Sequence, residues 1–524
     1  MAAKKEQRSA PRSKDAVTTI GVLVVLLVLS AVLWANSMTK PVSRDEHMYC
    51  TAGALLARGQ AIYQDFAYPS QLPYHPLLLA TLYRVFHTSH YLLVGRLVSV
   101  ICEILTLAAI VGVYRAVFGA RPQGLILGAA AAVLYVFNPL VEYAGGYAWN
   151  HSVVVLCVML SLWLLITTDF QKSARWRRLA LIGALLTFAT CMRITTALVE
   201  AFFLVAIIIA ARGSVRNRVF AALPFSLAAF AVALWPICIA VRAGEAFRLN
   251  LMRIPALYGQ WLHEIGIVRN KLGLTIAAFA TPAYLLLLVL AGCLLWVLLR
   301  RWRALSTPVR TMAAIAGVLP LVFFVIAYIP PTMWRQYLAI PVPFLLTALA
   351  YPLASVRGEH DKAANPSLYR FAWGTVGVCT AVTVLANPTV LSRSLVLLAP
   401  DYWVPTTLHR ASVDIARQAA EPQRALTLGP LYALEGGCDI YPELACGAII
   451  YRAADSLSAE ERALTHTVGL ETLGPLLEKQ PPAVVILGVE PEHFAFLEEP
   501  LRRVVVRNWH RDTYENGLFV YTRP

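Results

Sequence analysis

Residues 41–76 read PVSRDEHMYCTAGALLARGQAIYQDFAYPSQLPYHP and lie between two strongly apolar runs. The stretch is unusually polar for a chain in which 58% of the residues are hydrophobic. Ser43, followed three residues later by Glu46, forms a capping-box pattern, and Gly59 suits the end of a helix. Apolar side chains recur on one face between these signals. The segment therefore predicts a short amphipathic helix within a loop.

The composition places this loop in a membrane protein. Mean hydropathy is +0.61, only 14% of the residues are charged, and apolar runs of about 20 residues recur along the chain. The formal net charge is +15. Because Lys and Arg sit in short blocks between apolar runs, they are interpreted as topology signals and not as a nucleic-acid site. The composition excludes a soluble enzyme, and the loop helix is expected to lie on the membrane.

The apolar runs predict about eleven membrane spans. The first follows a basic tail at 1–15 and lacks a clear cleavage site, so we expect it to be retained. Two adjacent runs are short and nearly continuous, which leaves ten or twelve spans open. The predicted spans lie near residues 16–36, 91–114, 122–140, 150–168, 178–192, 194–211, 219–241, 272–299, 311–329, 336–355 and 371–389.

The distribution of positive charge predicts the orientation. With the N-terminus inside, the inner segments hold 21 Lys and Arg residues, against about 11 in the outer loops before the last span. We therefore expect a multi-pass protein of the cytoplasmic (inner) membrane. Its outer side would carry two long loops, 37–90 and 241–271. The second loop is rich in cations, which indicates either an anionic ligand or lipid headgroups.

The composition changes after the last span. Residues 400–524 combine a polar helical stretch, ASVDIARQAAEPQ, with the strand-like runs RALTLG, AVVILG and GLFVYTR. This alternation predicts a small extracytoplasmic α/β domain. Cys438 and Cys446 are its two cysteines, and we expect them to form a disulfide because that compartment permits one.

The first loop holds the best candidate for chemistry. Asp45 lies in the first turn of the predicted helix, where the helix dipole is expected to keep its carboxylate ionised, and it shares a face with Tyr49. A positioned carboxylate of this kind can act as a general base. Glu46 is either its neighbour in the reaction or only the capping residue.

Several segments together resemble the GT-C glycosyltransferases. The segments that carry the resemblance are RDEHMYCTAGALLARGQAIYQDF followed by YHPLLLA, LVGRLVSVICEILTLAAIVGVYR, NPLVEYAGGYAWNHS and PPTMWRQYLAIPVPFLLTALA. The pattern is similar to that of dolichyl-phosphate-mannose protein mannosyltransferases and of the bacterial lipid A aminoarabinose transferase. It covers residues 16–390, which it implies form a GT-C-like transmembrane domain with 37–90 as the outer catalytic loop.

The resemblance also implies an activity. These families transfer a sugar from a polyprenyl-phosphate donor on the outer face, with inversion, to a lipid, glycan or protein acceptor. The acidic residue of the first loop lies at their reaction centre, which corresponds here to Asp45 with Glu46 beside it. Arg193, Arg335 and Tyr337 correspond to positions that would bind the donor phosphate. Because Arg335 follows the rigid PPTMW turn, we expect it to be the more important arginine.

Other residues of the outer loops are candidates for contact with the substrate. An arginine there could instead lie in the lipid headgroup region, and a histidine could simply be solvated. The absence of an Asp-x-Asp pair in the first loop gives no support for a metal there, and no cofactor is predicted. The candidates are Arg44, Tyr49, Arg58, Asp65, His75 and His151.

Two functions of other classes remain possible. A secondary transporter or lipid flippase would also have many spans, and it predicts that Glu103 and Glu200 line a central cavity. A non-catalytic envelope assembly protein would use the C-terminal domain to recruit partners. The absence of an internal repeat and the large external domain favour the glycosyltransferase.

Overall fold

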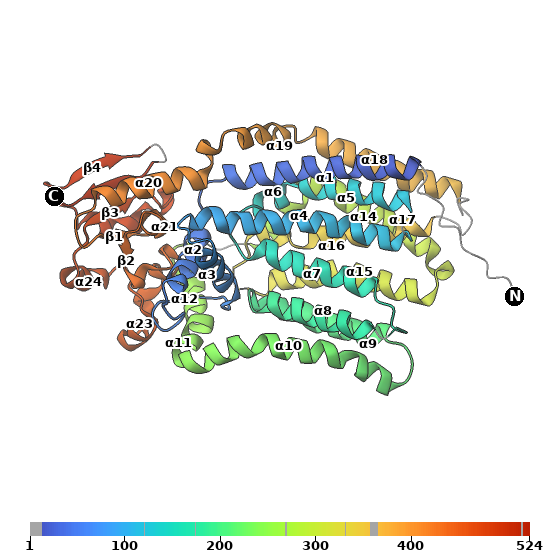
Figure 1. Ribbon diagram of the computed structural model, residues 1–524, viewed down its shortest axis with the longest axis horizontal. Coiled ribbons are helices and arrows are strands. Elements are labelled where there is room, and N and C mark those ends of the chain that lie inside the picture. Colours follow the sequence, from blue (N-terminus) through green and yellow to red (C-terminus); the bar gives the residue numbers. More distant parts are fainter. Residues whose placement is uncertain are drawn as a thin grey trace.

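The computed structural model is a bundle of long helices with a small α/β unit at one end (Figure 1). Seven segments in the described part of the chain are long and apolar enough to cross a membrane. Many apolar side chains on the outside of the bundle are exposed, among them Leu27, Val325 and Val378, as lipid contact requires. The structure describes residues 13–119, 121–172, 174–267, 270–330, 332–356, 365–514 and 517–524.

The long membrane helices follow the predicted apolar runs. One of the seven segments is interrupted, since Arg335–Ser355 contains a short 3₁₀ turn, then α16 and α17. The long helices are α1 (Ser13–Thr39), α4 (Tyr91–Val117), α10 (Val215–Ala243), α14 (Pro282–Arg301), α15 (Thr307–Tyr328), α16 (Pro341–Ala348), α17 (Ala350–Ser355) and α18 (Pro366–Leu385).

Shorter helices occupy the remaining predicted spans. The predicted span 272–299 is wrong as one helix, because a new helix starts at Pro282 and separates α13 from α14. The exact number of membrane crossings stays a prediction. The shorter helices are α5 (Pro122–Val136), α7 (His151–Ile166), α8 (Arg175–Thr190), α9 (Ala197–Ala210), α13 (Lys271–Phe279) and α19 (Thr389–Ser392).

The loop elements gather at one end of the bundle. Figure 1 shows α2, α3, α11 and α12 at the same end as the C-terminal unit, while α1 begins at the opposite end. A π-helical turn, Leu249–Arg253, connects α11 to α12. The elements of this end are α2 (Arg44–Ala57), α3 (Tyr74–Val85), α6 (Pro139–Ala144), α11 (Glu245–Arg248) and α12 (Ile254–Glu264).

The predicted C-terminal α/β unit is present and is built on a five-stranded sheet of order β2-β1-β3-β5-β4. β1 runs parallel to β2 and β3, whereas β5 is antiparallel to β3 and β4. The three predicted strand runs correspond to β1, β3 and β5. The strands are β1 (Arg424–Thr427), β2 (Asp439–Ile440), β3 (Val484–Leu487), β4 (His510–Thr513) and β5 (Phe519–Thr522).

Six helices surround this sheet. The predicted polar helix is confirmed as α20, which begins earlier than the quoted stretch. The helices are α20 (Val404–Gln418), α21 (Leu431–Leu434), α22 (Ala448–Tyr451), α23 (Ala459–Thr465), α24 (Leu473–Lys479) and α25 (Glu499–Arg502).

The C-terminal unit and the outer loops share one apolar core. Tyr49 and Leu79 of the first loop belong to the same buried cluster as Leu257 of the second loop and Ile415 and Leu434 of the C-terminal unit. Burial of apolar side chains on both sides of a contact stabilises it. The C-terminal unit is therefore packed onto the loops that carry the candidate site.

Candidate functional site

Helix α2 positions the central residues of the site. Its predicted capping box is confirmed, since Ser43 Oγ accepts the Glu46 N–H and a Glu46 carboxylate oxygen accepts the Ser43 N–H. At the other end, the Arg84 guanidinium donates to the carbonyls of Leu56 and Ala57. All residues of this helix from Glu46 to Leu55 are buried, so the helix packs against other parts of the chain on several sides, and its position relative to the membrane surface stays a prediction. It is enclosed by the bundle and the C-terminal unit.

Glu46 belongs to a buried network that holds three segments together. Its carboxylate pairs with the Arg96 guanidinium of α4, at 2.8 Å, and neither side chain is exposed. The same carboxylate accepts the Ala148 N–H at 2.8 Å. Arg96 also donates to the carbonyls of Ser37 and Lys40. With every lone pair engaged, Glu46 has a structural role here, in agreement with the capping interpretation.

A loop between α6 and α7 closes over this network. Gly146 lies at φ +79°, and a side chain there would meet Ser37 Cα at 2.9 Å, so the close approach requires glycine. Its N–H donates to Glu103 Oε1 at 2.7 Å. On the other side, Lys40 Nζ donates to the carbonyls of Tyr143 and Gly145. The segment NPLVEYAGGYAWNHS is thereby fixed against the start of α2.

Asp45 stands next to Glu46 but has different surroundings. Its carboxylate is partly exposed and makes no hydrogen bond or ion pair with the described residues. Burial raises its pKa to about 6, while the charges of Arg44, Arg452 and Arg193 oppose the rise. Loss of solvent therefore has a larger effect on this carboxylate than the neighbouring positive charges. A carboxylate with such a pKa is mostly ionised at neutral pH and readily protonated below it.

Arg193, in the turn between α8 and α9, lies close enough to Asp45 for its charge to lower the pKa of that carboxylate. Its guanidinium lies over the Tyr337 ring, 4.8 Å from the centroid, and no hydrogen bond or ion pair to the described residues engages it. The turn is held to the first loop, because the Tyr74 N–H donates to the Cys191 carbonyl and Asn150 Nδ2 donates to the Met192 carbonyl. This arrangement leaves a free cation beside a free carboxylate.

Tyr49 and His75 form one wall next to this pair. Tyr49 follows Asp45 by one helical turn, and its ring meets the His75 ring edge to face at 4.8 Å between centroids. Both ring nitrogens of His75 are buried, and neither forms a hydrogen bond of good geometry with the described residues, although the Trp149 backbone lies close to the ring. Burial lowers the pKa of His75 to about 3, which keeps the imidazole neutral. Such unsatisfied polar atoms beside an acid are typical of a ligand site.

Arg335 is placed differently from the expectation. Its side chain is exposed and its guanidinium lies over the Tyr143 ring, 5.5 Å from the centroid. Among the groups that alter the pKa of Asp45 and Tyr49, Arg193 appears and Arg335 does not. The structure therefore brings Arg193 and Tyr337 to Asp45 and leaves Arg335 outside this group.

Two other loop arginines contact the C-terminal unit. Arg44 pairs with Glu490 at 2.6 Å, and Arg58 lies 3.6 Å from Asp439. Asp65 accepts the Ala61 N–H at 2.7 Å and so stabilises its own turn. These three residues have structural partners.

His151 is buried at the start of α7, which contradicts the expectation of a solvated side chain. The neighbouring Asn150 donates to Gln71 Oε1 of the first loop at 3.1 Å. Asn150 therefore holds the start of α7, where His151 is buried, against the first loop.

The predicted disulfide is wrong. Cys438 and Cys446 are both buried and both free. The Cys446 thiol instead donates to the Ala67 carbonyl of the first loop, at 3.0 Å. The thiol is thus directed across the contact between the two parts of the molecule and away from its own domain.

The sequence did not indicate Arg452, which lies at the end of α22. Its guanidinium pairs with Glu490 at 2.8 Å and lies 4.5 Å from the centroid of the Phe494 ring. Its charge lowers the pKa of Asp45. Because Arg452 is about 400 residues away in the chain and has no motif around it, only the tertiary structure reveals it.

Most cations of the second loop are already paired. Arg248 binds Glu245, Arg253 lies 3.7 Å from Glu461, and Lys271 Nζ donates to two backbone carbonyls. Arg269 lies outside the described residues. An anion site formed by this loop as a whole is therefore not favoured by the structure.

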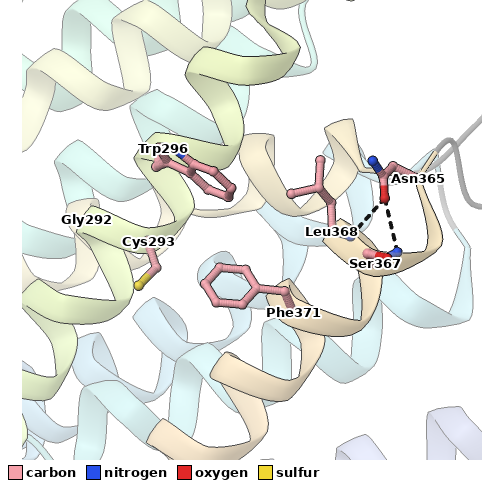
Figure 2. A pocket seen from close by; sticks show the side chains of 7 residues that line it. All are labelled: Gly292, Cys293, Trp296, Asn365, Ser367, Leu368 and Phe371. Carbon is pink, nitrogen blue, oxygen red and sulfur yellow. Dashed lines mark hydrogen bonds between the residues drawn. The ribbon is translucent and has the colours of Figure 1, made fainter.

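A pocket of about 710 Å³ lies between α14 and α18, away from Asp45 (Figure 2). Trp296, Leu368 and Phe371 give it a mainly apolar lining near the start of α18. No acid or base lines it. The pocket therefore lacks the groups that sugar transfer needs.

Residues 69–237 match the family model described as dolichyl-phosphate-mannose-protein mannosyltransferase. Among solved structures, the chain is similar to ArnT from Cupriavidus metallidurans bound to undecaprenyl phosphate. The TM-score is 0.57, with 15% identity over 98% of each chain. ArnT in the apo state gives the same TM-score and identity, over 96% of this chain and 98% of that one.

A second solved structure is the Archaeoglobus fulgidus oligosaccharyltransferase tethered to an acceptor peptide. It gives a TM-score of 0.50 and 12% identity, over 96% of this chain and 74% of that one. No curated protein sequence matches the chain. The resemblance inferred from the sequence is thus confirmed by the mannosyltransferase family model over residues 69–237 and by the GT-C fold of ArnT over nearly the whole chain.

Proposed function

We propose that this membrane protein is a glycosyltransferase that moves a sugar from a polyprenyl-phosphate donor to an acceptor, with inversion. One observation carries the proposal: within the fold of ArnT, the Asp45 carboxylate and the Arg193 guanidinium make no hydrogen bond or ion pair with the described residues, and they lie close enough for the charge of Arg193 to lower the pKa of Asp45. The ArnT structure contains undecaprenyl phosphate, and the matched family is named for a dolichyl-phosphate donor. The two free groups have the charges that such a reaction needs.

Asp45 is the proposed general base. An acceptor hydroxyl or amine attacks the anomeric carbon of the donor, and its proton passes to the carboxylate as the new bond forms. Burial raises the pKa of Asp45 to about 6, which makes it a stronger base than an ordinary aspartate and leaves it ionised at pH 7. Tyr49 and the neutral His75 lie on the same wall and are proposed to contact the sugar or the acceptor.

Arg193 is the proposed ligand of the leaving phosphate. As the bond from sugar to phosphate breaks, negative charge grows on the phosphate, and a guanidinium can bind two of its oxygens. The Tyr337 ring supports the guanidinium from one side, which fixes its direction. No hydrogen bond within the described chain has to break before this contact forms.

The proposed orientation places the site outside the cytoplasmic membrane. Both long loops and the C-terminal unit lie at one end of the bundle (Figure 1), and among the segments that precede the last predicted span, those assigned to the inner side contain more Lys and Arg than the outer loops. A reporter fused after Pro524 should be active only outside, and one fused at Arg177 only inside. Activity of the Pro524 fusion in the cytoplasm would reverse the proposed orientation.

No observation favours transport. Glu103 accepts hydrogen bonds from Gly146 and Ser152, and Glu200 accepts them from Thr187 and Thr190. Both carboxylates thus hold neighbouring segments of the bundle, Glu200 through both oxygens and Glu103 through Oε1, while Glu103 Oε2 is buried without a partner among the described residues.

The proposed activity can be tested with the full chain in proteoliposomes. Polyprenyl-phosphate sugars serve as donors, and mass spectrometry compares envelope lipids and glycans of cells with and without the protein. We expect one sugar modification to depend on the protein and on Asp45, while Asp169→Asn, an exposed carboxylate at the opposite end, leaves it intact. If every modification persists without the protein, and no donor is consumed in vitro, the proposal is wrong.

A further inference from the structure

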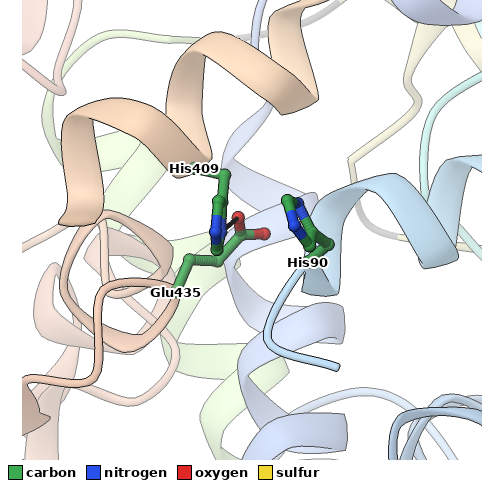
Figure 3. A group of neighbouring side chains, drawn as sticks. All are labelled: His90, His409 and Glu435. Carbon is green, nitrogen blue, oxygen red and sulfur yellow. Dashed lines mark hydrogen bonds and ion pairs between the residues drawn. The ribbon is translucent and has the colours of Figure 1, made fainter. Parts of the chain in front are cut away.

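Two histidines and a glutamate meet where the C-terminal unit contacts the membrane bundle (Figure 3). His90 precedes α4, His409 lies on α20, and Glu435 directly follows α21. One potential ligand atom from each residue lies within 4.8 Å of the other two. None of the three belongs to the site around Asp45.

The two imidazole rings are stacked, with centroids 3.6 Å apart and an angle of 30° between their planes. His409 Nδ1 is 3.1 Å from Glu435 Oε2, and His90 Nδ1 is buried with no hydrogen-bond partner. Figure 3 shows the carboxylate reaching toward the space beside both rings. Two imidazole nitrogens and one carboxylate oxygen thus lie close together, and His90 Nδ1 has no hydrogen-bond partner among the described residues.

We propose that His90, His409 and Glu435 bind a divalent transition metal, of which Zn²⁺ suits the ligands best. Two histidines and a glutamate, with a water as fourth ligand, are an established zinc set. Ligand atoms around a tetrahedral zinc lie about 3.3 Å apart, given bonds of about 2.0–2.2 Å. The pair His409–Glu435 already has about this separation, whereas the His90 ring, which stacks on His409, must turn as well as move closer to direct its lone pair at the ion.

The surroundings of Glu435 support the role of a metal ligand. Its Oε1 accepts the Leu92 N–H at 2.7 Å, which orients the carboxylate and leaves Oε2 toward the imidazoles. Outer hydrogen bonds of this kind orient ligands in metal sites. His409 also borders an open pocket of about 280 Å³ on α20, so an ion can reach it from outside the protein.

A metal here would connect the C-terminal unit to the first loop. Glu435 follows α21, and the Leu431 N–H of α21 donates to His47 Nδ1 of α2 at 3.4 Å. His47 lies two residues after Asp45. The metal would therefore stabilise the contact between α21, α4 and α2 without touching the reacting groups.

The test uses the full chain without a histidine tag, purified in detergent and freed of metal by a chelator. Co²⁺ is titrated and followed by its visible absorption, and Zn²⁺ is measured by competition against Co²⁺. The variants are His90→Gln, His409→Gln and Glu435→Gln. Glu435→Gln keeps a side-chain oxygen that can accept the Leu92 N–H, so the hydrogen bond to the first turn of α4 is preserved. His510→Gln, an exposed histidine on β4, is the control.

We expect one equivalent of Co²⁺ per chain, with the absorption of nitrogen and oxygen ligands and no thiolate charge-transfer band. Each ligand variant should weaken Co²⁺ binding about 10-fold or more, and His510→Gln should not. Zn²⁺ should raise the melting temperature of the wild type. Three outcomes would overturn the proposal: no stoichiometric binding, a thiolate band, or equal binding by the wild type, His409→Gln and Glu435→Gln.

Discussion

Replacement of Asp45 by Asn tests the proposed base most directly. The side chain keeps its size, and no hydrogen bond of the described chain is lost, because the carboxylate makes none. Only the ability to accept a proton disappears. A positioned base contributes about 10²- to 10⁴-fold to the rate, so turnover should fall by that factor while donor affinity changes little.

The pH dependence follows from the same carboxylate. With a pKa of about 6, Asp45 is about nine-tenths ionised at pH 7 and about one-tenth ionised at pH 5. The wild-type rate should therefore fall about 10-fold between these values, and an ordinary aspartate would show no such loss. The rate of the Asp45→Asn variant should not show this fall at acidic pH.

As pH rises, the stability of the wild-type protein should fall while its activity rises. Because the pKa in the folded protein lies above the ordinary 3.8, folding favours the protonated form, and stability is lost as pH rises through about 6. The difference corresponds to about 3 kcal/mol, which solvent screening at this partly exposed group reduces to about 1–2 kcal/mol. Above pH 7, Asp45→Asn should be the more stable protein.

The assay combines single-turnover transfer in lipid with thermal unfolding at pH 5 and pH 8. We expect Asp45→Asn to be nearly inactive at both, to melt higher than the wild type at pH 8, and to exceed it by a smaller margin at pH 5, because pH 5 lies between the unfolded and the folded pKa of Asp45. A rate within about 3-fold of the wild type would refute the base assignment. A lower melting temperature at pH 8 would show that the carboxylate makes a structural contact instead.

Four further variants test the roles of the charged residues around Asp45. Arg193→Gln should lower turnover about 10²- to 10³-fold, whereas turnover of Arg335→Gln, at an exposed position, should stay within about 3-fold of the wild type. Equal losses of turnover in the two variants would contradict this expectation. Glu46→Gln should cost about 3–5 kcal/mol of stability because it leaves the buried Arg96 unpaired, and an unchanged melting temperature would exclude that role. Glu490→Gln should free Arg44 and Arg452 to stabilise the ionised form of Asp45. The acidic limb of the pH–rate profile should therefore move to lower pH, and a shift to higher pH would refute this coupling.

The sequence was sufficient for features that depend on local pattern. Ser43 and Glu46 predicted the start of α2, since a capping box requires only two residues at fixed spacing. Apolar runs predicted the positions of most membrane helices, and alternating runs predicted β1, β3 and β5. The break before Pro282 was missed because the apolar run continues through it, although proline at the first helical position signals a new helix.

Contacts between distant segments could not be predicted. Arg452 and Glu490 approach the first loop from the C-terminal unit, and nothing near either residue indicates this. The expected disulfide failed for the same reason: compartment and cysteine count do not say that Cys446 faces Ala67. The preference for Arg335 over Arg193 relied on a rigid turn, whereas the direction of each guanidinium depends on packing around Tyr143 and Tyr337.

The adjacent acids Asp45 and Glu46 show how one short motif supplies both a scaffold and a reactive group. Successive residues of a helix point about 100° apart, so they cannot face the same surroundings. Glu46 is fixed by N–H groups of Ser43, Arg96 and Ala148, which prevents α2 from rotating about its axis. That constraint fixes the position of Asp45 on the neighbouring face of α2 without any contact of its own. The Asp45 carboxylate can therefore remain free to accept a proton, because Glu46 makes the contacts that hold α2 in place.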